Sequence, residues 1–132
     1  MRHGEDDGAD DGAAIVEFTL VAVLLAALFL ALLQFGLALY VRNTLTAAVA
    51  EGARVAANAD RGLVDGEQAT RTLIRTALAD SFADDVTSGV ETVNGIDTVY
   101  VEVRAQLPLV GFLGPARSLT VRGHALDEES LQ

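Results

Sequence analysis

The sequence predicts an α+β fold: one long apolar helix, then a second, amphipathic helix, then a small antiparallel sheet of about three strands. Three observations predict it. Residues 18–41 form an uncharged run, residues 65–82 carry apolar side chains at helical spacing, and residues 99–107 alternate between apolar and polar side chains. Each element can be justified in chain order.

The uncharged run is long enough to cross a membrane as a helix. At 1.5 Å per residue its 24 residues would span about 36 Å, against a hydrocarbon core of roughly 30 Å. A cleavable secretory signal has a shorter apolar region of about 7–15 residues behind a basic start, whereas the start of this chain is acidic. We therefore expect a helix that stays in the membrane, with Tyr40 and Arg42 at its aqueous end.

Changes of composition divide the chain into three parts. Residues 1–12 are polar and acidic, so we expect a leader that is disordered on its own. Residues 13–59 form the transmembrane helix and its extramembrane extension, whose alanines offer a smooth surface for another helix. Residues 60–132 form a small soluble α+β domain.

Within that domain we expect one helix and about three strands. The helix begins near Asp65, a good N-cap, and runs to about Phe82. The Asn94-Gly95 pair between two β-prone runs predicts a hairpin. The apolar link from Pro108 to Pro115 either tucks under the sheet or touches the membrane surface.

The alternation also predicts which side chains face the core of this domain. Glu102 belongs to the polar, solvent-facing set of its strand, opposite the apolar set. We expect the core to contain Val99, Val101, Val103 and Leu107 beside Leu73 and Leu78.

Composition excludes several classes of function. The chain has no cysteine, which rules out disulfides and thiolate metal sites, and a formal net charge of −10, which argues against a nucleic-acid partner. Asp84 and Asp85 are adjacent and would face apart, and of the two histidines His3 lies in the polar start and His124 on a predicted strand, where we expect a structural or surface role. We expect no catalytic residue, no metal and no cofactor, and therefore no enzyme.

The most informative segment is the junction ahead of the apolar run. Glu17 lies one turn inside the otherwise uncharged segment that begins at Gly12, and an intramembrane carboxylate costs on the order of 2.5–3.5 kcal/mol, so it usually has a partner. One interpretation is that Glu17 lies at the headgroup level and marks the helix start. The other is that the chain is cut after Gly12, so that Ala13 becomes the first residue and Glu17 the fifth, followed by Phe18.

In the second interpretation a glycine precedes the cut, a glutamate stands fifth after it and a long apolar helix follows, an arrangement that resembles the class III signal of type IV pilins and pseudopilins. The wider segment resembles the TadE-like proteins of tight-adherence loci. The resemblance covers about residues 11–57. It is carried by Gly12-Ala13-Ala14, Val16-Glu17-Phe18, Gln34-Phe35-Gly36 and Glu51-Gly52-Ala53-Arg54.

The resemblance implies a pilin-like fold and a minor pilin or pseudopilin for biogenesis of tight-adherence (Flp, type IVc) pili. It implies that prepilin peptidase cuts between Gly12 and Ala13 and that Glu17 and Phe18 serve assembly. The implied partners are the membrane, the peptidase, inner-membrane platform proteins, a TadF-like minor pilin and the Flp major pilin. The implied location is the cytoplasmic membrane as a single-pass protein with the C-terminal domain outside, in the pilus or in its assembly machine.

Two further interpretations stay open. One is a general-secretion pseudopilin that serves protein export, and the other is an uncleaved single-pass membrane protein whose soluble domain binds a partner. The acidic leader departs from the family pattern, because leaders of this family usually carry Arg or Lys. Loop charge would place the Arg42 flank in the cytoplasm, which opposes the orientation of a prepilin.

Overall fold

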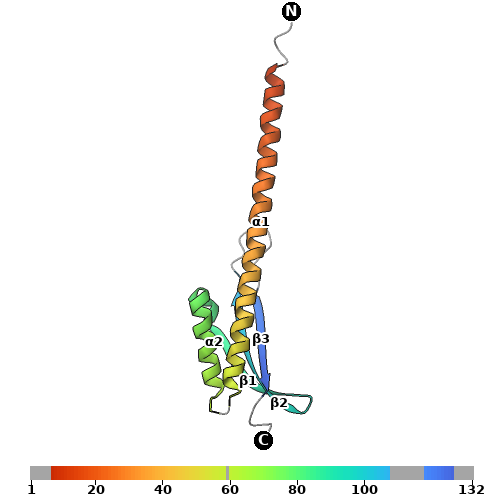
Figure 1. Cartoon of the computed structure of the whole chain (residues 1–132). Coiled ribbons are helices and arrows are strands. Elements are labelled where there is room, and N and C mark those ends of the chain that lie inside the picture. The colour runs from red at the N-terminus through yellow and green to blue at the C-terminus, as the bar shows by residue number, and fades with distance from the viewer. Residues whose placement is uncertain (1–6, 59, 108–117, 127–132) are drawn as a thin grey trace, which may run out of the picture. The chain divides into compact units, whose positions relative to one another are not determined.

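The computed structural model describes residues 7–58, 60–107 and 118–126. Along the chain the elements are α1 (Asp7–Ala56), α2 (Leu63–Ala77), the short 3-10 helix η1 (Asp80–Ala83), β1 (Asp85–Val93), β2 (Ile96–Gln106) and β3 (Ser118–Leu126), as Figure 1 shows. The predicted α+β fold, with its long apolar helix, second helix and small antiparallel sheet, is confirmed. The expectation for the link from Pro108 to Pro115 lies outside the described residues.

Helix α1 is continuous from Asp7 to Ala56. The expectation of a disordered leader is therefore wrong for residues 7–12, and for residues 1–6 it lies outside the described part of the chain. Carboxylates such as Asp10 and Asp11 are stabilising near a helix N-terminus, and a long helix needs no new nucleus to extend by a turn. By its contacts the chain divides into two compact units, Met1–Leu37 and Ala38–Gln132, and α1 contributes to both.

Helix α2 differs from its prediction at both ends. It begins at Leu63, with Gly62 and not Asp65 as its N-cap. The Asp65 carboxylate accepts a hydrogen bond from the Gly62 N–H at 3.0 Å, so Asp65 stabilises the first turn from its third position. The helix ends at Ala77 and not near Phe82, because Leu78 is extended (φ −132°, ψ 177°).

The sheet has the strand order β1-β2-β3, with both pairs antiparallel. Val101 of the central strand lies opposite Ser88 of β1 and Gly123 of β3. Asn94 and Gly95 both have positive φ, 53° and 82°, which is the backbone of a two-residue type I′ turn. The predicted hairpin is therefore confirmed.

The core of the folded unit lies between one face of the sheet and the C-terminal part of α1. As predicted, Val99, Val101 and Val103 are buried, and Leu78 and Leu107 pack against the core while half-buried. The expectation for Leu73 is wrong, since it is 41% exposed and its neighbour Ile74 is fully buried instead. The core also contains α1 residues that the sequence pattern did not assign to it, namely Val41, Leu45, Ala48, Val49 and Ala53.

Small residues allow the elements of this unit to approach closely. A Cβ added to Gly52 of α1 would lie 2.8 Å from the carbonyl oxygen of Gly66 in α2 and would collide with the Thr70 hydroxyl. That hydroxyl donates to the Gly66 carbonyl at 2.8 Å. On the sheet side, a Cβ on Gly123 would lie 2.6 Å from the Val49 carbonyl oxygen. The predicted packing of a helix on the alanine-rich extension is thus observed.

Candidate functional site

The predicted processing and assembly residues all lie on one stretch of α1. Gly12, Ala13, Glu17 and Phe18 are helical and exposed. Ala13 and Glu17 are four residues apart, so they share one helix face, with about 5–6 Å between Cβ atoms. No atom lies within 4 Å of a Cβ built on Gly12, so nothing in the described structure shields the Gly12–Ala13 peptide from that side.

Glu17 is the polar exception in this stretch. Among the described residues its carboxylate has no hydrogen bond or ion pair, whereas the nearby Thr19 hydroxyl donates to the Ile15 carbonyl at 2.8 Å. The hydroxyl is therefore satisfied within its own helix and the carboxylate is not. A carboxylate in this position can pair with a cation from outside the described chain.

The α1 segment that follows Glu17 is predominantly apolar on every side. All side chains from Asp10 to Leu33 are exposed, including large ones such as Leu24 and Phe29. A helix that is hydrophobic all round needs an apolar environment. Within the described residues, α1 is the one helix long and apolar enough to cross a membrane, by length and composition, which indicates a membrane anchor.

The outer face of the sheet carries a network of charges. Glu102 is only 6% exposed, so its predicted solvent position is wrong. Its carboxylate pairs with Arg122 at 2.7 Å and with Arg104 at 2.9 Å. The hydrogen bond from Arg122 is the main reason that the pKa of Glu102 lies below its ordinary value. These arginine side chains cover the carboxylate and neutralise it.

The same network includes the histidine of the sheet. His124 Nε2 lies 2.7 Å from Glu91 Oε1, and Arg122 reaches the other oxygen of Glu91 at 3.3 Å. Arg122 also stacks over the Tyr100 ring, with 4.4 Å between the guanidinium carbon and the ring centroid. With its carboxylates already paired to basic side chains, this surface has the character of a structural charge network.

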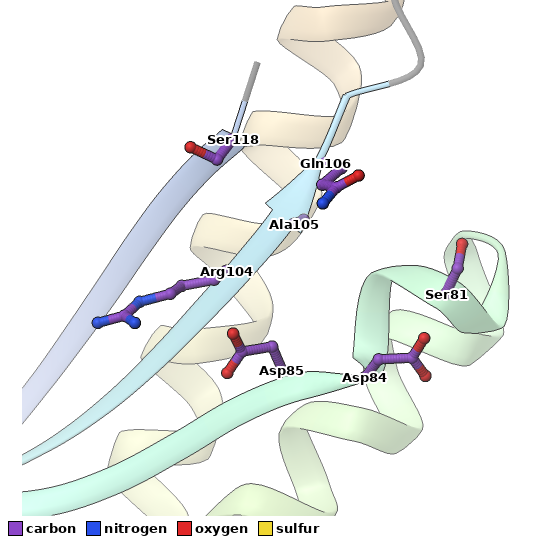
Figure 2. Close-up of a pocket in the computed structure, with 7 residues that line it drawn as sticks. All are labelled: Ser81, Asp84, Asp85, Arg104, Ala105, Gln106 and Ser118. Carbon is purple, nitrogen blue, oxygen red and sulfur yellow. The ribbon is translucent and has the colours of Figure 1, made fainter. Parts of the chain in front are cut away.

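An open pocket of about 660 Å³ lies at one end of the sheet. Figure 2 shows Asp84 and Asp85 pointing in different directions at its rim, with Arg104 on the neighbouring strand. The described residues contain no group of three or more His, Cys, Asp or Glu side chains placed to hold a metal ion. Among the residues that line the pocket, neither Ser81 nor Ser118 has a hydrogen bond to a carboxylate that could act as its base.

Comparison with known protein families identifies the N-terminal stretch. Residues 12–54 match the TadE-like protein family. The resemblance predicted from the sequence is confirmed over this range, which begins at Gly12 and includes Glu17. No curated protein and no solved structure matches the chain.

The TadE-like match indicates a protein related to the Tad pilus, in a family of structural proteins. It covers the apolar stretch and part of the α1 segment that packs in the folded unit, and it leaves α2 and the sheet outside. The burial of Glu102 could not be found from the sequence. Alternation predicts the strand face on which a side chain lies, but it does not predict which other side chains cover that face. The nearest sequence signal is Arg122 on a second strand.

Proposed function

We propose that this chain is a minor pilin or pseudopilin for biogenesis of the tight-adherence (Flp, type IVc) pilus, processed by prepilin peptidase after Gly12. The observation that carries the proposal is the TadE-like match, which starts at Gly12 and contains a carboxylate, Glu17, with no partner in the described chain. The exposed apolar helix that follows supports it, because such a helix needs a membrane or neighbouring helices.

Processing would depend on local opening of α1. The Gly12–Ala13 peptide lies within the helix, and a protease binds its substrate in an extended form. Glycine costs a helix roughly 0.8–1.0 kcal/mol relative to alanine, so Gly12 weakens the helix next to the bond to be cut. It also presents no side chain to the protease.

Cleavage would give Glu17 its role. The new amine on Ala13 is a cation at a helix N-terminus, where the helix dipole disfavours positive charge. Glu17 lies one turn away on the same face and can pair with this amine or with that of a neighbouring subunit. A buried charge left unpaired costs far more than a completed pair, so pairing would fix the register between subunits.

The proposal includes a location and partners. The leader faces the cytoplasm, α1 crosses the cytoplasmic membrane once, and the folded domain lies outside. The partners are the peptidase, inner-membrane platform proteins, a TadF-like minor pilin and the Flp major pilin. This orientation is required because the peptidase must reach the Gly12–Ala13 bond at the inner leaflet.

Single substitutions test the proposal in cells that carry the tight-adherence genes. Gly12→Val should leave a species heavier by the leader on an immunoblot, because the β-branched side chain blocks the protease cleft. Glu17→Ala should be cleaved normally but abolish pilus formation. Thr19→Val is the matched control on the same helix, since its hydroxyl is satisfied internally, and it should leave pili at the wild-type level.

The outcomes separate the alternatives. An uncleaved anchor predicts equal size for the wild type and Gly12→Val. A general-secretion pseudopilin predicts that Glu17→Ala stops protein export and leaves pili intact. Full pilus formation with Glu17→Ala would contradict the proposed role of the carboxylate.

A further inference from the structure

We propose that Asn94, at the tip of the β1–β2 hairpin, is a site of spontaneous deamidation whose isoaspartate product loosens the hairpin. The site is defined by the Asn94-Gly95 turn, in which both residues have positive φ and Asn94 is exposed. This inference does not depend on the proposed function.

The reaction needs only water. The backbone nitrogen of Gly95 attacks the side-chain carbonyl carbon of Asn94, which forms a five-membered succinimide and releases the amide nitrogen as ammonia. Water then opens the ring at either carbonyl. One opening gives aspartate and the other gives isoaspartate, so each event consumes one water and releases one ammonia.

The structure leaves both reacting groups accessible. Among the described residues, the Asn94 side chain has no hydrogen bond to hold it. Nothing lies within 4 Å of a Cβ built on Gly95, so the space beside its backbone is open. A larger residue at that position would crowd the ring, whereas glycine does not.

The closed turn must open before the ring can form, because ring closure requires rotation of the Asn94 backbone. The tip is suited to such opening. Its closing pair, Val93 and Ile96, is 44% and 42% exposed, and the next pair is joined by an exposed Thr92–Asp97 hydrogen bond of 2.9 Å. Segments with few buried contacts and exposed hydrogen bonds open at low free energy.

The product would not restore the turn. Isoaspartate adds a carbon to the main chain, and a two-residue type I′ loop sets the strand register through its backbone geometry. The new carboxylate also adds a negative charge three residues from Asp97. The release of ammonia makes the deamidation irreversible. The isoaspartate that forms weakens strand pairing at the hairpin tip.

Peptide mapping of the full-length protein in detergent micelles tests this site. After incubation at mildly alkaline pH, we expect both aspartate and isoaspartate at position 94. Asn43 is the internal control, because it lies within α1 and is followed by the β-branched Thr44, and it should keep its amide. Asn94→Gly suits the same turn and should abolish the new products without changing the circular dichroism spectrum.

Three results would overturn the inference. Retention of the Asn94 amide in the folded chain, with conversion in denaturant, would show that the turn protects it. Aspartate without isoaspartate would exclude the succinimide. Equal hydrogen exchange at the hairpin before and after conversion would contradict the claimed loosening.

Discussion

The close approach of α1 and α2 predicts that Gly52→Ala destabilises the folded unit. The added methyl group would collide with the Thr70 hydroxyl and lie 2.8 Å from the Gly66 carbonyl oxygen. Overpacking of this kind costs about 1–3 kcal/mol, against about 0.8–1.0 kcal/mol gained from the higher helix propensity of alanine. The expected result is a net loss of up to about 2 kcal/mol in the free energy of unfolding. In a unit of this size each kcal/mol lost lowers Tm by about 4–8 °C.

Thermal unfolding of the full-length protein in detergent micelles measures this loss. Ala50→Gly, at an exposed position of the same helix, is the control for helix propensity alone. Gly52→Ala should cost less in a Thr70→Ala background, because the hydroxyl in collision is then absent. A Gly52→Ala variant that is more stable than the wild type by the full gain in helix propensity, about 0.8–1.0 kcal/mol, would refute the close contact between the two helices.

Three further predictions concern the sheet and the topology. Val101→Asp should cost several kcal/mol and prevent folding, since Val101 is fully buried, whereas Val90→Asp on the same face should be mild because Val90 is 52% exposed; equal effects in circular dichroism would contradict this difference in burial. Because the pKa of Glu102 is lowered in the folded state, its contribution to stability is present above the unfolded pKa and lost as pH falls through the folded pKa. Glu102→Gln should therefore lose less stability than the wild type on acidification from about pH 6 to about pH 3. An equal loss of stability in the two proteins over this pH range would contradict the prediction. Reporter fusions near residue 60 should be active only as exported reporters, and cytoplasmic activity would overturn the proposed orientation.

Much of the fold follows from local patterns that a single sequence carries. The uncharged run predicts the long helix, the alternation around Val101 predicts the central strand, and Asn94-Gly95 predicts the hairpin, because each depends on residues adjacent in the chain. The ends of α2 were less predictable. Gly62 replaces Asp65 as N-cap because a carboxylate at the third helical position can stabilise the same turn.

Contacts between distant segments could not be derived in this way. Alternation predicted that Glu102 points away from the core, but its burial comes with a pair to Arg122, 20 residues further along the chain. The sequence predicts that the alanine-rich part of α1 packs against a helix. It does not predict that this part also packs against the sheet, a contact that is possible because Gly123 has no side chain to collide with the Val49 backbone. The candidate residues Gly12 and Glu17 were found because their signal is local.

The most direct test of the proposed function is the N-terminal sequence of the native protein extracted from membranes. The proposal requires a mature chain that begins at Ala13, with Glu17 as its fifth residue. A chain that begins at Met1, or at any residue other than Ala13, would contradict it.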